Sequence, residues 1–136
     1  MGKLVLICDS AALEKLQTVA LLASGAITSD HEVFLFFMHD AVYALKKDAP
    51  PEPKFNSIFP EVSDKLNQAR SEGKLIHWKE LLEDLKDLGE LRIVACVQVT
   101  EILGITKDDL LPIVDDIAGV NTLAEVAMKA DSIISI

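Results

Sequence analysis

The chain has few of the features that mark secreted and membrane proteins. It holds only two cysteines, Cys8 and Cys96, in 136 residues, so it has no disulfide framework of the kind that stabilises small secreted domains. Its first apolar run, residues 4–7, is too short for the core of a signal peptide or for a membrane span. We therefore expect a cytoplasmic protein with reduced thiols and no membrane partner.

Basic residues are also scarce. Thirteen Lys and Arg stand against 22 Asp and Glu, and the net charge of −9 repels phosphate backbones, which excludes nucleic acid as an expected partner. The glycine-rich patterns GxxxxGK[ST] and GxGxxG are missing, as is the GxSxG turn of hydrolases. We expect no nucleotide and no other cofactor.

The length and the apolar content set the expected size and assembly. A chain of 136 residues fits a single domain spanning residues 1–136. Hydrophobic residues make up 50% of it and the mean hydropathy is +0.30, which is high for a small domain. Part of the apolar surface is therefore expected to be buried between subunits, in a homo-oligomer.

The order of apolar runs and amphipathic segments predicts an α/β fold. Runs such as residues 33–38, Val-Phe-Leu-Phe-Phe-Met, lack polar alternation, which is typical of parallel strands covered on both faces. We expect a three-layer α/β/α domain with a five-stranded, mainly parallel sheet. The predicted strands are 3–7, 33–38, 91–95, 113–117 and 133–136, and the predicted helices are 11–24, 41–47, 61–71, 77–88, 97–103 and 122–130. Gly25 is expected to end the first helix, and the leucines of helix 77–88 fall on one face. Capping patterns are present at residues 106–109 and 122–125.

Residues 48–60 form a proline-rich connection whose four prolines prevent regular structure. Phe55, Ile58 and Phe59 supply apolar groups for docking. The segment is either a surface connection that covers its own core, a flap over the carboxyl edge of the sheet, or an arm that reaches a neighbouring subunit.

Chemistry is expected where the parallel strands end. Cys8, His39 and Cys96 each follow a predicted strand, so they should lie on one edge of the sheet. Three hypotheses remain open: Cys96 is a nucleophilic or sulfur-carrying thiol, Cys8 and Cys96 form a redox pair, or the two sulfurs and His39 bind a soft metal.

Cys96 is the stronger of the two thiol candidates, and its site is expected to be partly open. It closes one predicted strand and opens a predicted helix, and the partial positive charge of a helix N-terminus favours a thiolate. Cys8 ends a wholly apolar strand and is more typical of a buried small hydrophobe. His39 and His77 are expected to be capping or surface histidines.

Most of the chain resembles a known family, and the resemblance is weakest from Asp48 to Ser71. Residues 89–96, Gly-Glu-Leu-Arg-Ile-Val-Ala-Cys, are followed by residues 103–110, Leu-Gly-Ile-Thr-Lys-Asp-Asp-Leu, and by Ile-Ala-Gly-Val at 117–120. These segments and the proline-rich connection resemble the DsrE/DsrF-like family of sulfur-relay proteins, in particular its peroxiredoxin-like branch. Cys8 stands where that branch usually has a small polar residue, which indicates a second thiol chemistry.

This resemblance implies a small α/β/α domain that forms homo-oligomers and carries sulfane sulfur as a persulfide. Cys96 matches the sulfur-binding cysteine of the family, and the implied partners are small sulfur-carrier proteins or rhodaneses. The leading hypothesis is thus a cytoplasmic, sulfurtransferase-like carrier that uses Cys96. The alternatives are a non-catalytic oligomeric binding subunit with structural cysteines, and a redox or metal site formed by Cys8, His39 and Cys96.

Overall fold

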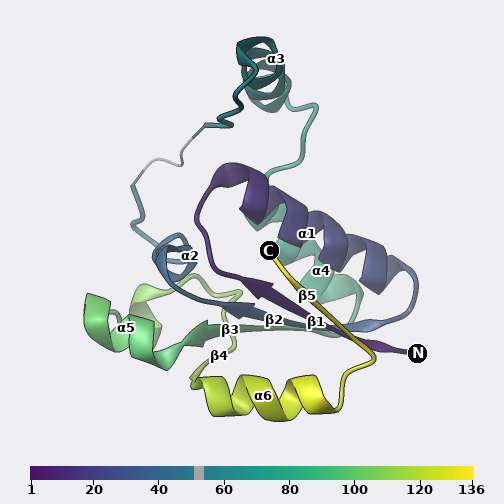
Figure 1. The fold of residues 1–136 in the computed structure, drawn as a ribbon, viewed down its shortest axis with the longest axis vertical. Helices are drawn as coiled ribbons and strands as arrows, with labels where there is room; N and C mark the ends of the chain where they lie inside the picture. The colour runs from purple at the N-terminus through teal and green to yellow at the C-terminus, as the bar shows by residue number, and fades with distance from the viewer. Residues whose placement is uncertain (51–53) are drawn as a thin grey trace.

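The fold is built on an all-parallel, five-stranded sheet (Figure 1). The computed structural model describes residues 1–50 and 54–136. The strands lie in the order β4-β3-β2-β1-β5, and every neighbouring pair is parallel, which confirms the expected sheet. Their bounds are β1 Lys3–Cys8, β2 Glu32–Phe37, β3 Leu91–Cys96, β4 Asp116–Ala118 and β5 Ser132–Ser135.

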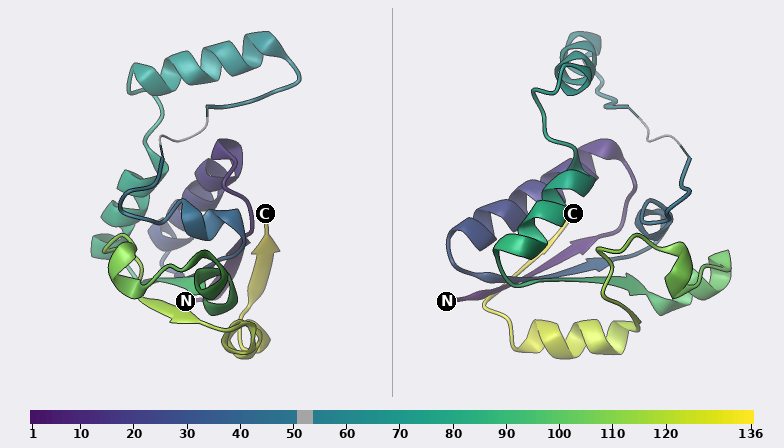
Figure 2. Two further views of the ribbon diagram at one scale, coloured as in Figure 1. Left: turned by 90° about the vertical axis from the view of Figure 1, so that its left-hand side faces the viewer. Right: turned by 180° about the vertical axis from the view of Figure 1, so that it is seen from behind.

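Helices cover both faces of the sheet. Helices α1 and α4 pack against each other over one face, and α6 lies over the other (Figure 2). This arrangement confirms the predicted three-layer α/β/α architecture. Within the described residues, no helix has both the length and the apolar composition that crossing a bilayer requires. The bounds are α1 Leu13–Thr28, α2 Asp40–Tyr43, α3 Pro60–Ser71, α4 Trp78–Leu88, α5 Val97–Leu103 and α6 Val120–Met128, with a 3₁₀ helix at Lys107–Asp109.

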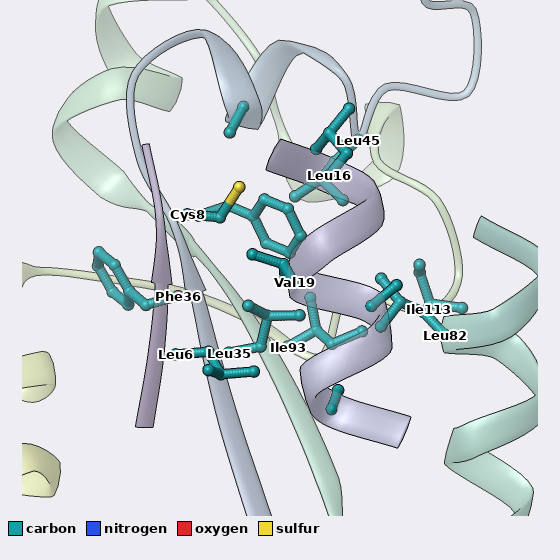
Figure 3. Close-up of a cluster of buried hydrophobic side chains, with 14 of the residues drawn as sticks. Leu6, Cys8, Leu16, Val19, Leu35, Phe36, Leu45, Leu82, Ile93 and Ile113 are labelled. Carbon is teal, nitrogen blue, oxygen red and sulfur yellow. The ribbon is translucent and has the colours of Figure 1, made fainter. Parts of the chain in front are cut away.

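The core occupies both sides of the three central strands. Because side chains alternate along a strand, Leu6, Leu35 and Ile93 point toward α1, whereas Phe36 points away from it (Figure 3). Strand β2 is the middle strand of the sheet, and its residues from 33 to 37 are all buried. The continuous apolar run at this strand is therefore explained by burial on two faces.

Helix α1 continues past the predicted stop at Gly25 and ends at Thr28. The last turn carries Ile27, which is buried against Gly89 at the end of α4. A glycine within a helix costs only about 1 kcal/mol relative to alanine. Burial of Ile27 outweighs that penalty, so the expectation that Gly25 ends the helix was wrong.

Helix α6 also begins earlier than expected. The predicted capping pattern placed its start at Thr122, but the N-cap is Gly119, whose carbonyl accepts hydrogen bonds from the backbone N–H groups of Thr122 and Leu123. The strand predicted at residues 113–117 is shorter and begins later than expected: β4 spans Asp116–Ala118. By contrast, the capping box of Thr106 and Asp109 is present in the 3₁₀ helix, as expected.

Helix α2 is shorter than the predicted helix 41–47 because the chain leaves it to pair with a distant segment. The backbone N–H of Leu111 donates to the carbonyl of Leu45, and that of Lys47 donates to the carbonyl of Asp109. These long-range bonds replace the bonds that another helical turn would make.

The proline-rich connection leads to a helix that stands away from the sheet. Helix α3 projects beyond α1 and α4 and buries none of its residues (Figures 1 and 2). Phe55 is buried and docks on the chain's own core, as expected. Ile58 and Phe59 are 90% and 62% exposed, so these two side chains do not dock on the core of their own subunit. Residues 51–53 of this segment lie outside the described residues.

Candidate functional site

The strand register brings the three predicted site residues to one edge of the sheet. Cys8 pairs with Phe37, and Phe37 pairs with Ala95, the residue before Cys96. His39 follows β2, which lies between the strands that carry the two cysteines. The expectation that these residues share the carboxyl edge is confirmed.

Cys96 lies where β3 passes directly into α5. It is the last residue of the strand and the N-cap of the helix, with extended backbone angles of φ −66° and ψ 123°. Its partner in the register is Ala118, which immediately precedes the N-cap of α6. Two helices therefore begin close to this residue.

The thiol of Cys96 is more enclosed than expected. Ile93 faces α1, and Cys96 is three residues further along the strand, so its side chain points to the opposite face, which α6 covers. The residue is only 2% exposed. The expectation of a partly open site was therefore wrong for a single subunit, because the face on which Cys96 lies is covered by its own chain.

Cys8 is enclosed on the other face. In Figure 3 its sulfur points toward α1, near Leu16. The side chain is fully buried, and its thiol lies 3.5 Å from the carbonyl oxygen of Ser10, to which it donates. Burial raises the pKa of Cys8 to about 11, and the carboxylates of Asp9 and Asp40 add to the increase. At neutral pH this residue is a protonated thiol.

The two cysteines do not form a disulfide in this structure. They belong to strands separated by β2, and two strand spacings place their Cα atoms about 10 Å apart. A disulfide requires a Cα separation below about 7 Å. Because the side chains also point to opposite faces, the redox-pair hypothesis finds no support in the geometry.

The metal hypothesis has no better geometric support. Across residues 1–50 and 54–136, no three His, Cys, Asp or Glu side chains gather closely enough to hold a metal ion. A site made of Cys8, His39 and Cys96 would have to draw ligands from both faces of the sheet.

His39 occupies an unusual backbone position at this edge. It is the N-cap residue of α2, with φ 52° and ψ −137°, and its side chain does not cap the helix. Positive φ is unfavourable for a residue that carries a Cβ atom. The next residue, Asp40, accepts a hydrogen bond from the backbone N–H of Ala11 at 3.0 Å and so ties α2 to the loop after β1. By comparison, His77 caps α4 by accepting from the N–H of Lys79, as expected of a capping histidine.

A cavity of about 530 Å³ opens beside His39. It was not predicted, because its walls come from four separate helices and from the loops next to them. Neither cysteine is among the residues that line it. The lining residues are mostly apolar: Ala11, Leu16, His39, Asp40, Tyr43, Ala44, Ala49, Pro50, Lys79, Val99, Ile102 and Leu103.

Comparisons with known proteins agree on the fold and the family. The crystal structure of the ychN protein from E. coli matches with a TM-score of 0.66 and 20% sequence identity, over the full length of both chains. The protein of unknown function MTH1491 from Methanobacterium thermoautotrophicum matches with a TM-score of 0.65 and 15% identity, again over both full lengths. No curated protein matches the chain. The model of the DsrE/DsrF-like family matches residues 2–136, and the chain therefore belongs to that family.

Proposed function

We propose that this protein is a sulfane sulfur carrier that holds the transferred atom as a persulfide on Cys96. Membership of the DsrE/DsrF-like family suggests a role related to sulfur relay. The observation that supports the choice of residue is the position of Cys96 at the carboxyl edge of a parallel sheet, directly before α5. Cys8 is the weaker candidate, because burial keeps it protonated at neutral pH.

The proposed transfer needs no outside oxidant. The thiolate of Cys96 attacks the outer sulfur of a donor persulfide, R–S–SH; a new S–S bond forms, the donor S–S bond breaks, and R–S⁻ leaves with the bonding electrons. An acceptor thiolate then attacks the outer sulfur of the Cys96 persulfide and regenerates the Cys96 thiolate. The protein thus acts as a sulfurtransferase-like carrier.

The surroundings of Cys96 suit a sulfur anion. The first backbone N–H groups of a helix have no partner within the helix, and both α5 and α6 begin beside this residue. Because Cys96 is 2% exposed, a donor reaches it only when part of its cover moves. Helix α6 is suited to such movement, since none of its residues is fully buried and a weakly packed helix opens at low cost.

The proposed partners follow from the same hypothesis. We propose small sulfur-carrier proteins or rhodaneses as donors and acceptors, and the cytoplasm, where thiols stay reduced, as the location. We also propose a homo-oligomer in which the exposed side chains of Ile58, Phe59 and Val62 contact a second copy.

One observation favours the alternative of a non-catalytic oligomeric binding subunit. Both cysteines are buried, as structural cysteines usually are. In that case sulfur donors leave both thiols unmodified in the folded protein, and replacing Cys96 affects only stability.

Intact-mass measurement after exposure to polysulfide distinguishes these functions. The wild-type protein should gain the mass of sulfur atoms, and a reductant should remove it. Cys96→Ser should abolish the gain, whereas Cys8→Ser, the matched control, should retain most of it; circular dichroism checks that both variants fold. Sulfur loading that persists in Cys96→Ser, or a wild type that gains no mass from any sulfane donor, would contradict the carrier function.

A further inference from the structure

The cavity beside His39 has the size and composition of a small-molecule site. Its volume of about 530 Å³ lies within the range of ligand pockets, roughly 300–1,000 Å³. Its walls include Leu16 of α1, Ala44 after α2, and Val99 and Ile102 of α5. These segments follow the ends of three parallel strands, which is where ligands bind in open α/β sheets.

The charged groups around the cavity favour a neutral ligand. Lys79 contributes a positive charge and Asp40 a negative one, so the two largely cancel at the wall. Asp40 already accepts the N–H of Ala11, and the ammonium group of Lys79 lies 5.4 Å from the centre of the Trp78 ring. A ligand charge that leaves water for this mostly apolar wall would meet no net countercharge in return.

His39 supplies a hydrogen-bonding group at the cavity. Its imidazole makes no hydrogen bond to any residue within the described ranges, and the residue is exposed. A neutral imidazole carries one donor and one acceptor, so it can pair with a hydroxyl or a carbonyl. The backbone of His39 is held at φ 52° although a side chain is disfavoured there, and such positions are concentrated at ligand-binding sites.

We propose that this cavity binds a small neutral molecule with an apolar body and one hydroxyl or carbonyl group, and that this group meets His39. Medium-chain alcohols have this chemistry. The site is separate from Cys96, which does not line the cavity, so the proposal stands or falls independently of sulfur transfer.

Competition against a fluorescent probe tests the ligand class. N-phenyl-1-naphthylamine, a neutral apolar dye, should bind the wild-type protein and should be displaced by 1-octanol. Octanoate and octylamine have the same apolar chain but carry a charge, and each should displace the dye about tenfold less well. A dye that does not bind, or a charged compound that competes as well as 1-octanol, would overturn the proposal.

Two pairs of variants locate the site. Ala44→Trp fills the cavity and should weaken dye binding at least about tenfold, while Ala124→Trp adds the same bulk to an exposed position of α6 and should not. His39→Gly should lower the affinity for 1-octanol by about 2- to 10-fold, because one hydrogen bond is lost. Asp30→Gly is its control, since Asp30 has a similar φ of 63° but does not line the cavity.

Dilution and these variants also distinguish a small-molecule ligand from a second copy of the chain as the occupant of the cavity. If the dye binds only after dilution dissociates an oligomer, a second copy of the chain covers the cavity and the proposal fails. It fails equally if Ala44→Trp and Ala124→Trp bind the dye alike, or if His39→Gly and Asp30→Gly bind 1-octanol alike. His39→Gly keeps the test decisive if Ala44→Trp does not fold, because glycine suits positive φ.

Discussion

Alkaline pH should destabilise this protein through Cys8. The pKa of this fully buried thiol is about 11, against an ordinary value of 9.0. Well below pH 9 the thiol is protonated in both the folded and the unfolded chain, and its contribution to stability is complete. Between pH 9 and pH 11 the unfolded chain loses the proton while the folded chain keeps it, so rising pH favours unfolding.

The size of this effect follows from the pKa difference. A gap of about two pH units, at about 1.4 kcal/mol per unit, corresponds to a total of about 3 kcal/mol of unfolding free energy, of which about 2 kcal/mol is lost between pH 9 and pH 11. The side chain has no solvent exposure, so the value needs no reduction for solvent screening. The total free energy of unfolding of a typical domain is only about 5–15 kcal/mol, so a loss of this size is measurable.

Urea unfolding in a reducing buffer, followed by the fluorescence of the buried Trp78, measures the effect. Other groups also contribute to the pH dependence of stability, so the informative quantity is the difference between the wild type and Cys8→Ala at each pH. The stability advantage of the wild type should fall by about 2 kcal/mol between pH 9 and pH 11. Two stability curves that stay parallel across this range would refute the reasoning.

Further predictions concern packing and assembly. Gly89→Ala should destabilise the fold by about 1–3 kcal/mol, because the added Cβ would lie 2.7 Å from Cγ2 of Ile27. Gly25→Ala, where the Cβ meets nothing within 4 Å, should instead stabilise it by about 0.5–1 kcal/mol; urea unfolding compares the two, and a gain in both variants would contradict the packing argument. Phe59→Ser should weaken self-association in light scattering while circular dichroism stays unchanged, and a wild type that is monomeric at all concentrations would rule out the proposed arm.

Much of the fold could be predicted because local patterns and tertiary packing agree. The apolar run of β2 indicated a strand covered on both faces, and the amphipathic helix α4 appears where its leucines predicted it. The predictions failed where distant contacts outweighed local signals. Helix α1 passes Gly25 because Ile27 packs on Gly89, and α2 stops early because Leu45 bonds to Leu111.

For the site, the sequence alone determined that Cys8, His39 and Cys96 follow strands and therefore share one edge of a parallel sheet. Only the tertiary structure decided how they are oriented and enclosed. Strand order puts β2 between the cysteines. Side-chain alternation along β3 turns Cys96 away from the face on which Ile93 and Cys8 lie, so the two sulfurs are on opposite faces. The cavity beside His39 also belongs to the tertiary structure alone, because its walls come from helices far apart in the chain. The hydrophobic periodicity of a segment indicates whether it forms a helix or a strand. Whether a side chain is buried, or lines a cavity, depends instead on which distant segments pack against it.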